Sequence, residues 1–127
     1  MRLPNVLIPV LTGLEWKKSF LLEAAGQSSL AVVVYLIDQS SGLTAAEMQK
    51  ELDDKEALLT EIDETLHSVG KRSKIYNEWG TLKEKIPLIA QREKVTEIAV
   101  LKHGKMAEKQ IEEIKSLGIP VREIEAY

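Results

Sequence analysis

The chain has 127 residues, enough for one hydrophobic core and too few for two. Hydrophobic residues make up 44% and charged residues 29%, a balance that is typical of a globular domain and unlike that of a disordered chain. The 17 basic and 20 acidic side chains give a net charge of −3, so no nucleic-acid partner is expected. Cysteine is absent, which excludes disulfides, thiolate metal sites and a cysteine nucleophile, and favours a reducing compartment.

The apolar runs are too short to span a membrane. The longest, residues 6–11 and 30–37, fall far below the roughly 20 residues that cross a bilayer. Residues 1–5 carry one charge and Pro9 interrupts the apolar run that follows, which is unlike a signal peptide. We therefore expect a single cytoplasmic domain over residues 1–127, with no membrane partner.

The first predicted elements are a strand and a helix. Residues 5–11 are apolar and rich in branched side chains, which predicts a buried strand. Thr12 and Glu15 have the spacing of a capping box, so a helix is expected to begin there and to end near Gly26. Its apolar side chains recur at helical spacing, at Trp16, Phe20 and Ala24.

A central strand and a long helix follow. Residues 30–37 show no polar alternation, as expected for a strand that is covered on both faces. Thr44 and Glu47 form a second capping box, and the chain has neither glycine nor proline from there to Val69, which predicts one helix over 45–69. Its apolar stripe consists of Ala45, Met48, Leu52, Leu59, Ile62, Leu66 and Val69. Either the stripe packs on the sheet, or its outer half also pairs with another protein chain.

The alternation of strand and helix then continues. Residues 74–79 predict a short mixed strand, and Thr81 with Glu84 forms a third capping box. Pro87 lacks the backbone N–H that a helix interior needs, so a kink or an irregular first turn is expected there. Residues 96–101 predict the fourth strand.

The last two elements are a helix over 106–117 and a strand over 119–127, near an edge of the sheet or an interface. Gly118 ends the helix and Pro120 prevents its continuation. The core-facing residues of the helix are Ala107, Ile111, Ile114 and Leu117. With right-handed crossovers, the order βαβαβαβαβ predicts a three-layer α/β/α sandwich around a mostly parallel, five-stranded sheet.

Ligands of open parallel sheets bind beyond the carboxyl ends of the strands. The turn at 101–105 combines a helix start with two lysines, which favours a small anion, although a solvated loop explains the same residues. Asp38 either accepts a ligand hydroxyl or caps the next turn through Ser40 and Ser41. The candidate ligand-binding residues at these ends are Thr12, Gly13, Asp38, Lys102, His103, Gly104 and Lys105.

The sequence offers no catalytic or metal-binding motif. His67 lies off the apolar stripe and is expected to be solvated, and His103 has no second ligand at metal spacing. A Gly-x-Ser-x-Gly nucleophile motif and a facing pair of carboxylates are both missing. We therefore expect no catalytic residue, no metal and no cofactor, and we do not expect an enzyme.

Three segments resemble a known family. Residues 6–10 (VLIPV), 30–35 (LAVVVY) and 96–104 (TEIAVLKHG) resemble the first, second and fourth strands of universal stress proteins, and the element order matches over nearly the whole chain. The resemblance implies an adenine nucleotide alpha hydrolase-like fold with strand order 3-2-1-4-5. It also implies a homodimer in which the C-terminal strand pairs with its two-fold mate, an arrangement that protects an exposed edge. The candidate interface residues are Ile119, Val121, Arg122 and Ile124.

The chain departs from the ATP-binding members of that family. Those members carry an acidic residue after the first strand, where Leu11 stands here, and a Gly-x2-Gly-x9-Gly-Ser/Thr loop after the fourth. Of the glycines only Gly104 matches, since Leu101 occupies the first position and Ile114-Lys115 the last two. The chain also passes almost directly from Gly104 into a helix. The resemblance therefore implies a degenerate nucleotide site that does not bind ATP in the family's manner.

Two functions are compatible with these features. The first is a universal stress protein-like regulatory or interaction module, active in stress response as a homodimer. The second is a binding protein for a nucleotide or a phosphorylated metabolite that uses the crevice between the first and fourth strands. An enzymatic role through residues that only the fold brings together is a third alternative, because fold does not fix function.

Overall fold

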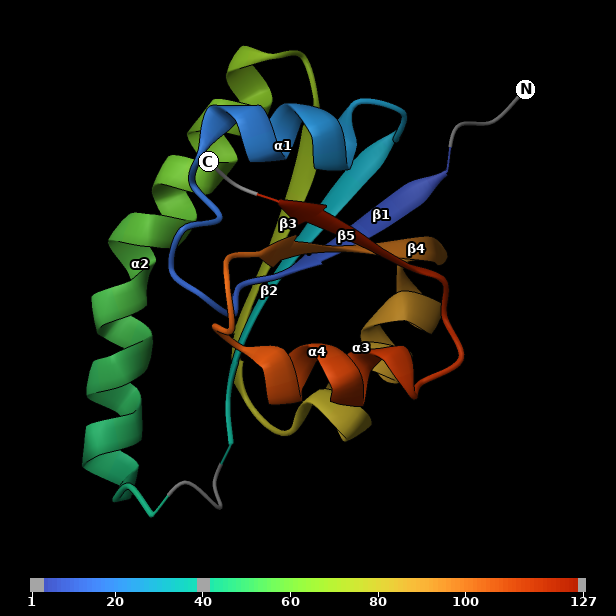
Figure 1. The fold of residues 1–127 in the computed structure, drawn as a ribbon. Coiled ribbons are helices and arrows are strands. Elements are labelled where there is room, and N and C mark those ends of the chain that lie inside the picture. Colours follow the sequence, from blue (N-terminus) through green and yellow to red (C-terminus); the bar gives the residue numbers. More distant parts are fainter. Residues whose placement is uncertain (1–3, 39–41, 126–127) are drawn as a thin grey trace.

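The computed structural model describes residues 4–38 and 42–125 (Figure 1). Within these ranges five strands and four helices alternate along the chain. They are β1 (Asn5–Pro9), α1 (Lys18–Ala25), β2 (Leu30–Ile37), α2 (Ala45–Ser68), β3 (Arg72–Trp79), α3 (Leu82–Arg92), β4 (Val95–Lys102), α4 (Glu108–Lys115) and β5 (Val121–Glu125). None of the described helices is both long and apolar enough to cross a membrane.

The strands form one fully parallel sheet in the order β3-β2-β1-β4-β5. β1 lies at the centre, and β3 and β5 form the two edges. β2 and β3 pair in continuous register, whereas the register between β1 and β4 shifts between Asn5 and Val6. The predicted α/β fold class and strand order are confirmed.

Two helices cover each face of the sheet (Figure 1). Because successive side chains of a strand point to opposite faces, Val6 and Ile8 of β1 pack towards α1 and α2, while Leu7 packs towards α3 and α4. On the first face the helices contribute Phe20, Leu21, Ala24, Leu59, Ile62 and Leu66. On the second face they contribute Ile86, Ile89, Ile111 and Ile114.

The start of α2 has the predicted capping box. The backbone N–H of Glu47 donates to Thr44 Oγ1 at 3.1 Å, and the backbone N–H of Thr44 donates to the Glu47 carboxylate at 3.0 Å. The backbone hydrogen bond from Thr44 is the main cause that lowers the pKa of Glu47. Two donors at the helix start, which have no partner inside the helix, are thereby satisfied.

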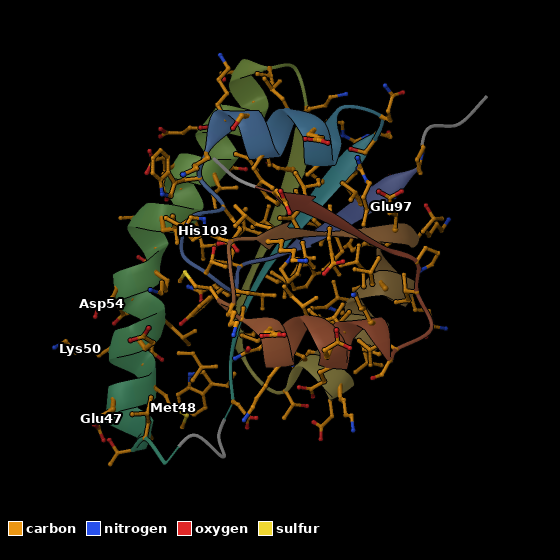
Figure 2. The ribbon with its side chains drawn as sticks, in the orientation of Figure 1. Glu47, Met48, Lys50, Asp54, Glu97 and His103 are labelled. Atoms are coloured by element: carbon orange, nitrogen blue, oxygen red, sulfur yellow. The ribbon has the colours of Figure 1, made fainter. Side chains whose placement is uncertain are left out.

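The apolar stripe of α2 packs mainly on the sheet. Ala45 is exposed and Val69 is half-buried, and the buried members of the stripe are Met48, Leu52, Leu59, Ile62 and Leu66. Met48 and Leu52 form a small separate cluster with Ile37. Figure 2 shows Met48 on the side of α2 that faces the sheet, and Glu47, Lys50 and Asp54 on its outer side. This arrangement supports the first interpretation of the stripe, and pairing with another chain stays untested.

The predicted start of the first helix is wrong. α1 begins only at Lys18, and its N-cap residue, Lys17, makes no side-chain capping bond. Thr12 and Glu15 hydrogen-bond to each other, but they do so within the loop that follows β1. As a consequence Trp16, which was expected in the core, is 40% exposed. Capping-box spacing identifies a pair of residues that can meet, and it does not by itself fix where the helix begins.

Among the last three elements, one prediction is confirmed and two boundaries differ. The predicted cap of α3 is confirmed, since Thr81 Oγ1 accepts from the Glu84 N–H at 3.2 Å; α3 runs from Leu82 to Arg92 with Pro87 inside it, and the predicted kink stays untested. α4 begins at Glu108 instead of residue 106, because Ala107 adopts a left-handed conformation with φ of 57°. Ala107 is half-buried as a result. The last strand, β5, begins at Val121 instead of residue 119, and residues 126–127 of the predicted strand lie outside the described residues.

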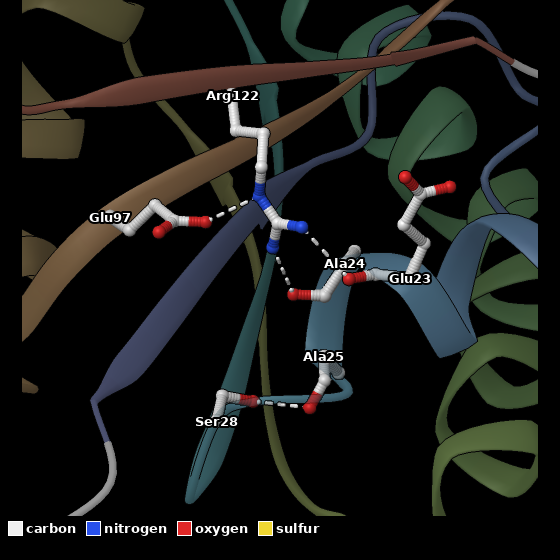
Figure 3. Close-up of polar contacts among 6 residues, drawn as sticks. All are labelled: Glu23, Ala24, Ala25, Ser28, Glu97 and Arg122. Atoms are coloured by element: carbon white, nitrogen blue, oxygen red, sulfur yellow. Dashed lines mark hydrogen bonds and ion pairs between the residues drawn. The ribbon is translucent and has the colours of Figure 1, made fainter.

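One arginine ties the edge strand β5 to the layer beside it. Arg122 donates from Nε to Glu97 on β4 at 2.7 Å, and its two terminal nitrogens each donate at 3.1 Å to the backbone carbonyls of Glu23 and Ala24 (Figure 3). These carbonyls belong to the last turn of α1 and lack partners inside the helix. Arg122 therefore joins β4, β5 and α1 through a planar, fork-shaped donor.

Candidate functional site

A cavity of about 340 Å³ lies at the carboxyl ends of the strands. Its lining residues come from the ends of β1 and β2, the β3–α3 turn, and helices α3 and α4: Val10, Leu11, Tyr35, Leu36, Asp38, Gly80, Leu82, Gln110 and Glu113. Such a position is the usual ligand site of an open parallel sheet. The Tyr35 hydroxyl donates to Glu51 on α2 at 3.1 Å. Burial and, after it, Glu51 raise the pKa of Tyr35, so this phenol is neutral at physiological pH.

The loop after β1 is organised around the carboxylate of Glu15, which is fully buried. Oε2 accepts from the backbone N–H groups of Leu11 and Thr12 and from the Thr12 hydroxyl, each at 3.0 Å. Oε1 accepts from the backbone N–H of Gly13 at 2.9 Å. Successive backbone N–H groups of this kind form a concavity that binds anions. In this chain the concavity is occupied by a carboxylate of the chain itself.

The β4–α4 turn borders a separate hollow of about 140 Å³. The hollow is lined by Lys102, Gly104, Met106, Glu108, Ile111, Glu112, Lys115 and Glu123. Lys115 pairs with Glu123 at 3.3 Å and with Glu112 at 3.7 Å, and the hydrogen bond to Glu123 is the main cause that raises the pKa of Lys115. The lysine-rich turn predicted from the sequence therefore faces several carboxylates, which weakens its attraction for an anion.

The structure does not gather the predicted ligand-binding residues into one site. Asp38 lines the 340 Å³ cavity, and Lys102 and Gly104 line the hollow beside α4. The other four predicted residues line neither of these two spaces: Thr12, Gly13, His103 and Lys105. The predicted capping of Asp38 through Ser40 and Ser41 falls outside the described residues.

Two of these four residues already have a local role, and His103 has one through its backbone. Thr12 and Gly13 donate to Glu15. The carbonyl of His103, on the β4–α4 turn (Figure 2), accepts from the N–H of Met106 at 3.1 Å. Local hydrogen bonds of this kind hold the turn in shape without defining a ligand site.

Sequence reasoning missed the residues that shape this end of the sheet. Glu15 was assigned to a helix cap, although a Thr-x-x-Glu pair directly after a strand equally fits a carboxylate that folds back onto the strand's own loop. Gln110 and Leu82 carry no local signal, because only the crossover of α3 and α4 over the sheet brings them to the cavity. Tyr35 was recognised as a strand residue, and its bond to Glu51 depends on how α2 lies against β2.

A polar cluster of three residues lies on α2 and β3. His67, which was expected to be solvated, has 59% of its side chain exposed, and its Nε2 lies 3.1 Å from Ser73 Oγ and 3.6 Å from Asp63 Oδ1. Ser73 also donates to Asp63. A hydrolytic triad needs serine and aspartate on opposite ring nitrogens, whereas here both approach Nε2. In addition, the described residues contain no group of three or more His, Cys, Asp or Glu side chains that is placed to hold a metal ion.

The fold defined by this sheet and its four covering helices is that of the universal stress proteins, and the predicted resemblance is confirmed at the level of the fold. The hypothetical protein MJ0577 aligns with a TM-score of 0.74 and 21% sequence identity, over 100% of this chain and 99% of its own. A universal stress protein in complex with cAMP aligns with a TM-score of 0.67 and 9% identity, over 100% of both chains. An AMP-bound family protein from Arabidopsis thaliana aligns with a TM-score of 0.66 and 12% identity, over 98% of this chain and 92% of its own. No family model and no curated protein sequence matches the chain.

Proposed function

We propose that this chain is a universal stress protein-like regulatory or interaction module that acts as a homodimer. In this proposal it has no enzymatic activity, and it does not bind ATP in the manner of the family's ATP-binding members. The observation that carries the proposal is the buried carboxylate of Glu15, which takes the N–H donors after β1. A negative charge at that position repels the phosphates of a nucleotide and leaves them no donor in this loop.

The segment after β4 supports the same conclusion. Only residues 103–107 separate β4 from α4, which leaves little backbone to wrap around phosphates. Ile114, at the position of the family's last loop glycine, is fully buried in the core between α4 and the sheet. A phosphate loop in this place would require α4 to unfold and expose Ile114, at a cost of roughly 1.5–3 kcal/mol for that side chain alone.

The homodimer is proposed from the free edge of β5. β5 pairs only with β4, so one row of its backbone groups has no strand beside it among the described residues. Of the predicted interface residues, Ile124 packs into the protein's own core, Ile119 and Val121 are partly buried there, and Arg122 is bound to α1 and β4. A dimer through this edge would therefore use mainly the β5 backbone.

The dimer is tested by light scattering on the wild type and on Glu123→Pro. The carbonyl of Pro120 accepts from the N–H of Ile98 on β4 at 2.8 Å, so it points towards β4. Because the backbone groups of successive strand residues point to opposite edges, the N–H of Glu123, three residues further on, points to the free edge. Proline there removes a donor for the partner and leaves the pairing with β4 intact. Glu123→Ala is the matched control, since it also loses the ion pair with Lys115. The wild type and the control should be dimeric and Glu123→Pro monomeric; a monomeric wild type at micromolar concentration contradicts the proposal.

The alternative is a binding protein for a nucleotide or a phosphorylated metabolite that uses the crevice between β1 and β4. The 340 Å³ cavity favours a ligand at this end of the sheet, since its volume is in the range of small-molecule sites, but its lining includes the end of β1 and no residue of β4. Two proteins of the same fold are described with cAMP and with AMP bound. Calorimetric titration with AMP, cAMP and ATP separates the two functions. Binding of AMP or cAMP that Asp38→Ala weakens would favour this alternative. No heat with any of the three would favour the interaction module, and tight binding of ATP would overturn our proposal.

A further inference from the structure

A second cavity, of about 390 Å³, lies at the amino ends of the strands, opposite the candidate site. It is lined by Pro4, Asn5, Ser29, Leu30, Arg72, Lys94 and Thr96. The pairing of the strands explains why residues so far apart in sequence meet there. Arg72 of β3 lies opposite Leu30 of β2, Leu30 lies opposite Asn5 of β1, and Asn5 lies opposite Val95 of β4.

The charge of this cavity is positive although the chain as a whole is acidic. Its lining includes Arg72 and Lys94 and no carboxylate. Within the described residues, neither of these two side chains takes part in an ion pair. Of the acids near this end of the sheet, Glu93 is bound to Lys74 at 2.8 Å and Glu97 to Arg122 at 2.7 Å. Among residues 4–38 and 42–125, the two cations of the cavity therefore have no carboxylate within ion-pair distance.

The backbone of Lys94 adds an independent observation. Lys94 has φ of 55°, the left-handed conformation in which a helix commonly ends and for which glycine is the usual residue. A lysine in this conformation is strained, and strained residues gather at binding sites, where the surrounding structure holds them in place. Glycine would serve the cap of α3 better, so the cap alone does not account for a lysine at this position.

Two hydrogen bonds of the lining residues join segments that are distant in sequence. Asn5 Nδ2 donates to the carbonyl of Glu93 at 2.7 Å and fixes the α3–β4 turn. The N–H of Ser29 donates to the carbonyl of Pro4 at 2.7 Å. A preorganised rim lowers the entropic cost of binding.

We propose that this cavity binds a phosphate-bearing anion. Arg72 donates a planar fork that matches two phosphate oxygens, Lys94 adds a point charge, and the side chains of Asn5, Ser29 and Thr96 offer neutral hydrogen bonds. The cavity is larger than one phosphate group needs, so it has room for the rest of a phosphate ester. This cavity is separate from the 340 Å³ cavity at the carboxyl ends of the strands, and the proposal does not depend on the proposed function.

The test is a titration of the isotopically labelled protein with inorganic pyrophosphate, followed by ¹H–¹⁵N NMR. The amide signals of Ser29, Leu30, Arg72 and Thr96 should move in a saturable manner, while those of Leu11 to Gly13 at the other end of the sheet should not. The double variant Arg72→Ala/Lys94→Gly should weaken binding at least about tenfold, since it removes two charge-assisted contacts. The control Lys18→Ala/Lys109→Ala removes the same charge from exposed helical positions and should bind like the wild type.

The single variant Lys94→Gly separates binding from folding. Glycine relieves the left-handed strain, so this variant should unfold at a higher temperature and still bind pyrophosphate more weakly. Sedimentation with phosphatidylcholine vesicles that contain phosphatidic acid distinguishes the sources of the phosphate. Binding to pyrophosphate supports a free phosphate ester, and binding to vesicles alone, lost in the double variant, supports a lipid headgroup. No binding in either experiment, or an equal loss in the control, overturns the proposal.

Discussion

Replacing Glu15 by alanine should destabilise the protein substantially, because one carboxylate serves four donors. The carboxylate accepts from three backbone N–H groups and one hydroxyl, at 2.9 to 3.0 Å. A hydrogen bond to a charged group contributes about 1.5–3 kcal/mol. The four bonds share one acceptor and the loop is half-buried, so water can replace part of them and their contributions do not add. We expect a loss of about 3–4 kcal/mol, a large share of the roughly 5–15 kcal/mol that stabilises a domain.

Glu15→Gln should cost about half as much. The glutamine oxygen can take the place of Oε2 and keep the bonds from Leu11 and Thr12, but its amide nitrogen then faces the N–H of Gly13, so one acceptor is lost together with the charge. The expected loss is roughly 1.5–2 kcal/mol. The order wild type, glutamine, alanine is therefore a specific consequence of the geometry.

Urea unfolding, followed by tryptophan fluorescence and circular dichroism, measures these differences. The midpoint should fall in that order while the slope of the transition stays constant, because the surface exposed on unfolding is the same. Glu23→Ala is the matched control, since its side chain is exposed and its loss should stay within about 0.5 kcal/mol. If Glu15→Ala unfolds at the same urea concentration as this control, the assignment of Glu15 as the centre of the loop is wrong.

Two further predictions concern ion pairs. Arg122→Ala should lower the free energy of unfolding in urea by about 1–2 kcal/mol, and Arg122→Lys should lose most of the same amount. The reason is that an ammonium group cannot reach Glu97 and the end of α1 together. A lysine variant as stable as the wild type would show that charge alone matters. The hydrogen bond from Lys74, and after it the one from Tyr76, lowers the pKa of Glu93 in the folded protein below its ordinary value of 4.5. The Glu93 carboxylate therefore stabilises the folded protein above pH 4.5, and this contribution is lost as the pH falls through the lowered pKa. The difference in urea midpoint between the wild type and Glu93→Gln should therefore close on acidification over that range, and a difference that stays constant with pH would refute this role.

The fold was predictable because its signals are local and repeated. Residues 30–37 lack polar alternation and were assigned to a strand with the bounds that the structure shows. The long helix was bounded correctly within about a residue by Thr44 at one end and by Gly70 beyond the other. Errors arose where one pattern serves two structures. Thr12 and Glu15 have the spacing of a helix cap, and they form a loop around a buried carboxylate instead.

The candidate site was less predictable, because it depends on which strand ends share a cavity. Asp38 lines the 340 Å³ cavity at the ends of β1 and β2, whereas Lys102 lines a different hollow beside α4, so two residues that were predicted for one site lie in separate spaces. The local sequence around Lys102 does not contain Glu123, which reaches the hollow from β5. The cavity at the amino ends is assembled from four separate segments, and no single stretch of sequence signals it.

The central position of β1 has a consequence for the order in which the chain folds. β1 is made before the other four strands, and β2 can pair with one of its edges, and β3 with β2, as soon as they are made. Its other edge pairs with β4, where Asn5 meets Val95, so it stays open until most of the chain has been synthesised. β5 in turn has only β4 to pair with. Insertion of β4 beside β1 is therefore the long-range step that joins the two halves of the sheet, and changes at the contact between these strands should slow folding more than equal changes at the β2–β3 pair.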